Sequence, residues 1–142
     1  MKSLKFSYRE YPILDKKGKI LSLAYRPVID VRLIFRDKSR LFPAIIDSGA
    51  DESLFPAWMA KFLGHHLEKG KKVRMFRGIG GEIKAYLHQT YIEIGGVAFK
   101  SEVYYSDGFN DWEYGLLGER TFFSYFKVEL DYKSKLIILT PR

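Results

Sequence analysis

The sequence predicts a single all-β domain with one or two short helices. Apolar and polar residues alternate along most of the chain, which is the period of half-buried strands, and glycine-containing turns separate these segments. The chain has 142 residues, of which 46% are hydrophobic, so it can bury a core without disulfides or a metal. We assign one domain to residues 1–142, with a core at 28–126, an N-terminal hairpin at 4–25 and C-terminal strands at 127–140.

The first third of the chain is predicted to form strands. Residues 4–8 alternate apolar and polar side chains, and the turn at 16–19 joins them to an apolar run at 20–25. A third strand follows at 28–35. A charged turn then leads into an apolar strand at 41–46.

A helix is predicted after these strands. Pro56 suits a first helical turn and Gly64 suits a helix end, so we expect a helix over 56–63. His65 and His66 follow directly. Adjacent side chains do not face one ligand and zinc needs three or four spaced ligands, so we assign both histidines to the exposed helix exit.

The remainder alternates strands and glycine turns. A long hairpin is predicted at 72–87, two strands at 91–105, a short buried strand at 115–118 and one or two helical turns at 119–126. The hairpin tip is Gly78-Ile79-Gly80-Gly81. A phosphate-binding loop needs a helix after its glycines, whereas a strand pattern follows here. The tip suits closure over a bound chain, with a merely permissive turn as the alternative.

The candidate catalytic residues end the strand at 41–46. Asp47 follows buried positions, and a carboxylate is costly there unless it is hydrogen-bonded. Gly49 lets backbone amides turn toward this acid, and the Ser48 hydroxyl can bond across the loop. The same residues also suit an ordinary turn. The apolar strand before them and Ala50-Asp51 after them favour a functional loop.

Charge and composition restrict the function classes. The net charge of +7 permits contact with nucleic acid, but the basic residues gather at turns and no recognition helix or RNA-binding motif accompanies them. Nucleic-acid binding is therefore disfavoured, though it stays as an alternative. The chain has no cysteine, which excludes disulfides and thiolate zinc sites. No signal-peptide core and no apolar run of 18 residues occur, so we expect a cytoplasmic protein without a membrane partner.

Three motifs occur in an informative order: Ile45-Ile46-Asp47-Ser48-Gly49-Ala50-Asp51, the glycine tip followed by Ile83-Lys84, and Leu116-Leu117-Gly118. Together they resemble the retropepsins, the single-domain aspartic proteases of retroviruses and their cellular and bacterial relatives. The first resembles the Asp-Thr/Ser-Gly-Ala-Asp/Glu signature, the second the flap, and the third the strand before the short helix. The resemblance covers about residues 28–126 and implies a closed β-barrel of the double-psi acid protease type.

The resemblance implies an aspartic endopeptidase with Asp47 as the catalytic residue. Its chemistry uses two carboxylates that share one proton, and this chain has one Asp-Ser-Gly. A homodimer is therefore implied, with Ser48 and Gly49 holding the two loops together. The implied partner is a polypeptide substrate, and no cofactor or metal is implied. The implied substrate-binding residues are Ala50, Asp51, Ile79, Gly80, Gly81 and Leu116.

The chain departs from the family after Gly118. Retropepsins commonly place arginine next, where it braces the acid at the position of Asp51, but Glu119 stands here and Arg120 follows. An ion pair between Asp51 and Arg120 is compatible with a helical shift, whereas Glu119 in that place would repel Asp51. A noncatalytic peptide-binding or dimerisation module with the same fold therefore stays as an alternative.

Overall fold

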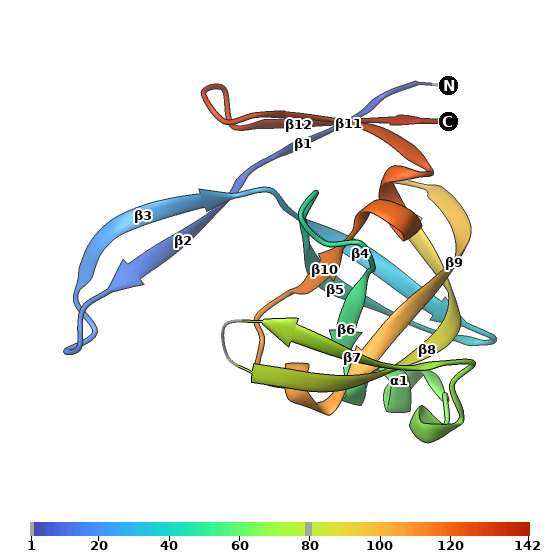
Figure 1. The fold of residues 1–142 in the computed structure, drawn as a ribbon. Coiled ribbons are helices and arrows are strands. Elements are labelled where there is room, and N and C mark those ends of the chain that lie inside the picture. Colours follow the sequence, from blue (N-terminus) through green and yellow to red (C-terminus); the bar gives the residue numbers. More distant parts are fainter. Residues whose placement is uncertain (1, 79–80) are drawn as a thin grey trace.

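The structure, a computed structural model, describes residues 2–78 and 81–142 (Figure 1). Strands dominate it, as the sequence predicts. The strands are β1 (Leu4–Ser7), β2 (Arg9–Leu14), β3 (Ile20–Arg26), β4 (Val28–Phe35), β5 (Lys38–Ile46), β6 (Leu54–Pro56), β7 (Val73–Gly78), β8 (Gly81–Ile94), β9 (Val97–Ser106), β10 (Gly115–Leu117), β11 (Phe126–Asp131) and β12 (Leu136–Pro141). The helix α1 spans Ala57–Leu63, and short helical turns lie at Leu67–Lys69, Asp107–Phe109 and Glu119–Phe123.

A closed barrel forms the body of the protein. Its strands follow the order β4-β5-β10-β6-β9-β8, and β4 also pairs with β8, so the sheet closes on itself. Strand β7 extends the sheet beyond β8 as the first strand of a long hairpin. Closure removes the unpaired edges of an open sheet. The predicted closed barrel is therefore present.

The barrel core is apolar and holds α1 in place. Leu33 of β4 and Ile92 of β8 are fully buried, and Met59 and Leu63 of the helix pack in the same core. Gly64 ends α1 with a φ of 95°, a left-handed conformation that glycine adopts at little cost. The predicted helix at 56–63 is thus confirmed. None of the described helices has the length and apolarity needed to span a bilayer.

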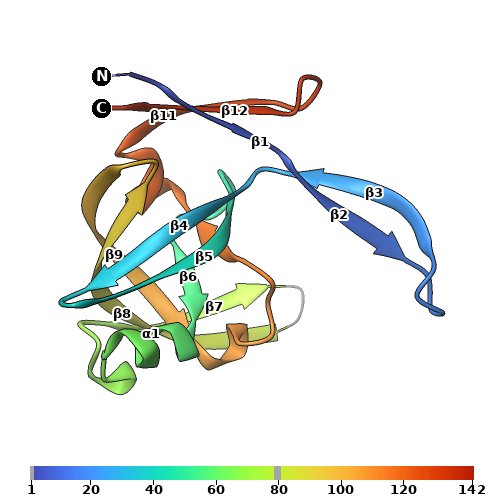
Figure 2. The same ribbon diagram turned by 180° about the vertical axis from the view of Figure 1, so that it is seen from behind.

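The predicted N-terminal hairpin at 4–25 is wrong in its first strand. Strand β1 pairs with β12, which also pairs with β11, and these three form a separate sheet at one end of the barrel (Figure 2). Leu4 and Phe6 pack against the barrel core, which fixes β1 there. The hairpin instead consists of β2 and β3. The predicted C-terminal strands correspond to β11 and β12.

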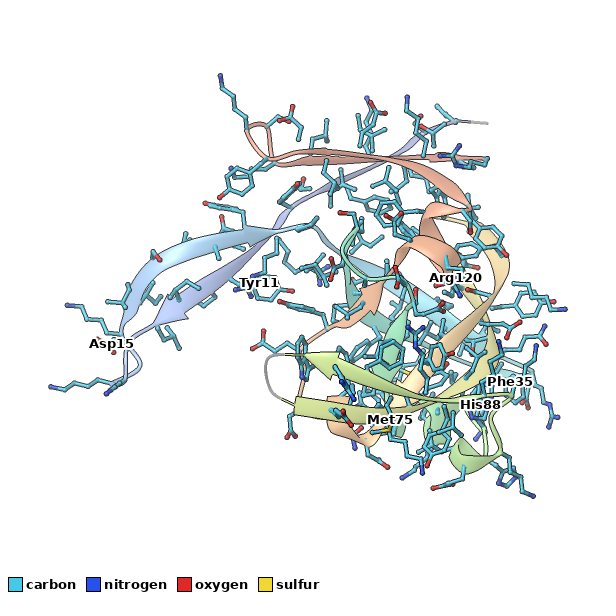
Figure 3. All side chains as sticks on the ribbon, in the orientation of Figure 1. Tyr11, Asp15, Phe35, Met75, His88 and Arg120 are labelled. Carbon is cyan, nitrogen blue, oxygen red and sulfur yellow. The ribbon has the colours of Figure 1, made fainter. Side chains whose placement is uncertain are left out.

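His65, expected at the exposed helix exit, is buried. Its ring centroid lies 3.9 Å from that of Phe35 and 4.6 Å from that of His88, both labelled in Figure 3. Burial lowers the pKa of His65 to about 4, and the nearby His88 and Arg36 act in the same direction. His66 is exposed. No group of three metal-ligating side chains occurs in residues 2–78 and 81–142.

Candidate active site

Asp47 directly follows the C-terminal end of strand β5. The strand runs parallel to β10, with Ile46 opposite Leu117. The Asp47 amide donates to the Leu117 carbonyl over 3.0 Å, so the ladder continues one residue beyond the strand. The backbone of Asp47 is therefore fixed by the sheet, while its side chain is only half-buried and reaches solvent.

The loop after Asp47 orients its carboxylate. The Gly49 amide donates to Asp47 Oδ1 over 2.9 Å, and the Ala50 amide donates to the Asp47 carbonyl over 3.2 Å. A Cβ atom at residue 49 would lie 3.2 Å from the same Oδ1, so a side chain there would crowd the acid. Within the described residues, Asp47 Oδ2 accepts no hydrogen bond. One oxygen is thus held and the other is left for a further partner.

The backbone after β10 straps this loop from behind. Glu119 donates its amide to the Ala50 carbonyl over 2.8 Å, and Arg120 donates to the Asp51 carbonyl over 2.9 Å. Gly118 must be a glycine, because a Cβ there would lie 2.8 Å from the Ala50 oxygen and closer still to the Glu52 carbonyl. The loop therefore has little freedom to shift relative to β10.

Two buried hydroxyls strengthen the strap, and sequence reasoning missed both. Ser53 Oγ accepts from the Gly118 amide over 3.1 Å and shares a 2.6 Å hydrogen bond with Thr121 Oγ1. Both side chains are buried. The two residues are 68 positions apart in the chain. Nothing local in the sequence identifies this pair, since each alone is an ordinary polar residue in an apolar segment.

Arg120 pairs with Glu52, not with Asp51 as expected. Its Nη1 lies 3.0 Å from Glu52 Oε1, and Arg74 approaches the same oxygen at 4.0 Å. The Glu52 side chain is buried, whereas Asp51 is exposed. The turn directs Asp51 outward and the next residue inward, so the buried acid takes the arginine. The guanidinium still braces the loop, one residue further along than the resemblance implied (Figure 3).

A cleft of about 860 Å³ lies between this loop and the β7–β8 hairpin. Its walls come from the loop, the hairpin, the turn at 107–109 and β10. Several of the predicted substrate-binding residues lie on these walls: Ala50, Asp51, Gly81 and Leu116. Ile79 and Gly80 lie outside the described residues. Sequence reasoning missed Phe109 and Trp112, which also line the cleft, with their rings stacked 4.5 Å apart.

Contacts near its tip hold the β7–β8 hairpin against β9. Phe76 pairs with Ile83 across the two strands, and its ring packs edge-on against Tyr104 at 5.1 Å. Ser106 Oγ donates to the Lys84 carbonyl over 2.6 Å. Met75, which is labelled in Figure 3, also lines the cleft and is half exposed. The hairpin therefore presents apolar side chains toward the cleft together with two arginines, Arg74 and Arg77.

Comparison with known proteins agrees with this geometry. The sequence matches the aspartyl protease family over residues 31–120, more than half of the chain. The structure is similar to a retropepsin-like aspartic protease from Rickettsia conorii, with a TM-score of 0.62 and 20% identity over 98% of this chain and 99% of that chain. EIAV protease complexed with the inhibitor HBY-793 is also similar, with a TM-score of 0.52 and 20% identity over 66% of this chain and 82% of that chain. A search of curated proteins found no match. The fold is therefore retropepsin-like.

Proposed function

Because the chain belongs to the aspartyl protease family, we propose that it is an aspartic endopeptidase that acts as a homodimer. The observation that carries the proposal is the Asp47 loop, which a strand, a strap and a glycine amide hold beside a peptide-sized cleft. Each chain supplies one such carboxylate. Peptide hydrolysis of this kind needs two, so the second Asp47 comes from a twofold-related copy.

The proposed mechanism follows from two adjacent carboxylates. Two such groups cannot both ionise at close range, so the pair shares one proton. The ionised Asp47 takes a proton from water as the water oxygen attacks the scissile carbonyl carbon, and the protonated Asp47 gives its proton to the carbonyl oxygen. The Asp47 that took a proton from water then gives that proton to the peptide nitrogen as the C–N bond breaks, while a hydroxyl of the tetrahedral intermediate returns its proton to the other Asp47. The products are a free carboxyl and a free amine, and the dyad regains its single proton.

The loop geometry suits this division of roles. The Gly49 amide orients Asp47 Oδ1, so Oδ2 is the oxygen available to water or to the second carboxylate. Ser48 is exposed beside it, and its hydroxyl makes no hydrogen bond within the described residues. In the proposed dimer this hydroxyl bonds to the loop of the other chain. Fixed donors of this kind hold the acids in position without reorganisation during the reaction.

The cleft supports an extended polypeptide as the substrate. Its volume lies in the range of ligand sites, on the order of 300–1,000 Å³. The β7–β8 hairpin can hydrogen-bond to an extended chain in the manner of an added strand. Leu116, Phe109 and Trp112 are apolar and line the cleft, so we expect apolar side chains in the substrate near the cleaved bond.

One observation favours a noncatalytic peptide-binding module instead. Glu119 stands where the resemblance leads us to expect arginine. The Arg120–Glu52 pair weakens this alternative, because it supplies a brace to the same loop. Both readings predict peptide binding, and only the endopeptidase predicts cleavage.

The test compares cleavage of a peptide library by the unmodified chain, Asp47→Asn and Asp37→Asn. Asp37 is an exposed acid in the β4–β5 turn and serves as the matched control. We expect Asp47→Asn to lose about 100- to 10,000-fold in kcat, the usual contribution of general acid–base catalysis, and Asp37→Asn to lose nothing. Equal cleavage by all three proteins contradicts the proposal.

A further inference from the structure

Strands β2 and β3 form an arm that leaves the barrel. They pair with each other and with no other strand among the described residues. Figures 1 and 2 show the arm extending away from the body. Figure 3 labels Tyr11 near the body and Asp15 at the far end of the arm. A lone two-stranded hairpin is marginally stable in water. An arm of this length therefore needs support from another surface.

The root of the arm is fixed to the body. Arg9 forms a 3.2 Å ion pair with Asp30 of β4. Arg26 donates to the Tyr114 hydroxyl over 3.3 Å, and the Tyr11 ring packs edge-on against the Tyr114 ring at 5.6 Å. Tyr114 directly precedes β10, the strand that holds the Asp47 loop. The direction of the arm is thus set by contacts next to the candidate active site.

The outer half of the arm is apolar and exposed. Leucine and isoleucine side chains there are 48% to 64% exposed: Leu14, Ile20, Leu21 and Leu23. The turn between them is ordered, since Asp15 Oδ1 accepts from the amides of Lys17 and Lys19 over 2.8 and 2.9 Å. An ordered ladder with so many exposed large apolar side chains indicates an interaction surface.

We infer that this arm clasps the second copy of the chain that completes the Asp47 site. The inference rests on the proposed homodimer, in which the two Asp47 loops face each other. The arm leaves the barrel on the same side as the end of β7 and the start of β8 (Figures 1 and 2). A copy that shares the cleft lies on that side, within the arm's reach. By twofold symmetry the arm of each chain packs against the other chain, so the apolar outer halves of both arms are buried in the dimer.

Charge also fits a second copy. The turn of the arm carries Lys16, Lys17 and Lys19. The segment at 106–114, which supplies one wall of the cleft, carries no lysine or arginine and three acids, of which Asp107 lies 3.9 Å from Lys61 while Asp111 and Glu113 have no ion pair among the described residues. A second copy therefore offers the arm a surface of opposite charge, which favours encounter in the correct orientation.

The test measures dimerisation apart from catalysis. Sedimentation velocity over a concentration series compares Leu21→Ser with Leu41→Ser, both in an Asp47→Asn background that prevents self-cleavage. Leu41 is the matched control, because it is 52% exposed on β5 and outside the arm. We expect Leu21→Ser to raise the dimer Kd about tenfold, since it removes a large buried apolar side chain from the contact, and Leu41→Ser to leave it unchanged. Thermal unfolding checks that both variants fold.

Thiol labelling locates the contact. The chain has no cysteine, so Leu21→Cys and Leu41→Cys each carry a single thiol. We expect maleimide labelling of Leu21→Cys to slow about tenfold as the protein passes from below to above its dimer Kd, with Leu41→Cys unaffected. Phosphatidylserine vesicles are added below that Kd. Slower labelling of Leu21→Cys with vesicles but not with concentrated protein assigns the arm to a membrane surface and overturns the inference.

The outcomes separate the arm from the proposed function. A dimer with equal Kd for Leu21→Ser and Leu41→Ser overturns the arm inference and leaves the endopeptidase untouched. A dimer weakened only by Leu21→Ser, together with an unmodified chain that cleaves no peptide, supports the arm and contradicts the endopeptidase. A protein that stays monomeric at every concentration overturns both.

Discussion

Removal of the Arg120 side chain tests how the active-site loop is braced. Glu52 is buried, and Arg120 lies 3.0 Å from its Oε1. Two charges about 4 Å apart attract by about 4 kcal/mol at an effective dielectric constant of about 20. The Arg120 side chain is 72% exposed, so solvent screens most of this attraction. We therefore expect Arg120→Ala to lower the free energy of unfolding by about 1 to 2 kcal/mol.

The assay is urea unfolding at one fixed protein concentration, arranged as two double-mutant cycles. One cycle combines Arg120→Ala with Glu52→Gln, and the other combines it with Asp51→Asn. We expect a coupling energy of about 1 to 2 kcal/mol in the first cycle and less than about 0.5 kcal/mol in the second. The control is Arg77→Ala, which breaks the 2.7 Å exposed pair with Glu82 and should cost under about 1 kcal/mol. A larger coupling with Asp51 than with Glu52 refutes the reasoning.

Four further results are expected. The free energy of unfolding should fall by about 1 to 3 kcal/mol between pH 6.5 and 4, because the pKa of His65 is lowered in the folded chain and the unfolded chain therefore binds one more proton. In urea unfolding, His65→Asn should lose this dependence of stability on pH, and the exposed His66→Asn should keep it. Initial rates of peptide cleavage should give a bell-shaped pH profile, since one Asp47 must be protonated and the other ionised, and a monotonic rise from about pH 4 to 9 would count against the shared proton. Specific activity should fall on dilution through the dimer Kd, and constant activity where sedimentation shows monomers would contradict a site made at an interface. Trp112→Ala should raise KM about tenfold with a smaller change in kcat, because this exposed side chain lines the cleft and would bind substrate without touching the reacting atoms. An unchanged KM would show that Trp112 does not contact the substrate.

The barrel and the Asp47 loop were predictable because their signals are local. Alternating strands, the apolar run before Asp47 and the glycines at 49 and 118 all act on the nearby backbone. The position of the helix α1 was equally clear from Pro56 and Gly64, since proline and glycine constrain the backbone whatever surrounds them.

Pairing between distant segments was not predictable in this way. The alternation at residues 4–8 predicted a strand correctly, but its partner was decided by Leu4 and Phe6 packing on a distant core. His65 looked like helix-exit surface, yet the ring of Phe35 covers it. Such contacts depend on the whole fold, and a pattern of single residues does not contain them.

The brace on the active-site loop shows the limit most clearly. The motif predicted that Arg120 pairs with Asp51, and the observed partner is the next residue along the chain. A single step along a turn reverses the direction of a side chain, so Glu52 became buried and Asp51 stayed exposed. Ser53 and Thr121 meet only because β6 and β10 pair. The place of the Asp47 loop in the fold was therefore predictable from sequence, and the contacts that support the loop were not.

The most direct test of the central claim is a subunit-mixing experiment. The unmodified chain is held at one concentration, above its dimer Kd, while Asp47→Asn chain is added in increasing excess and peptide cleavage is measured. If two chains build one site, mixed dimers are inactive, and activity should fall to about one half at equal amounts and about one tenth at ninefold excess. Activity that stays constant across the series would mean that one chain holds a complete site, which contradicts the account.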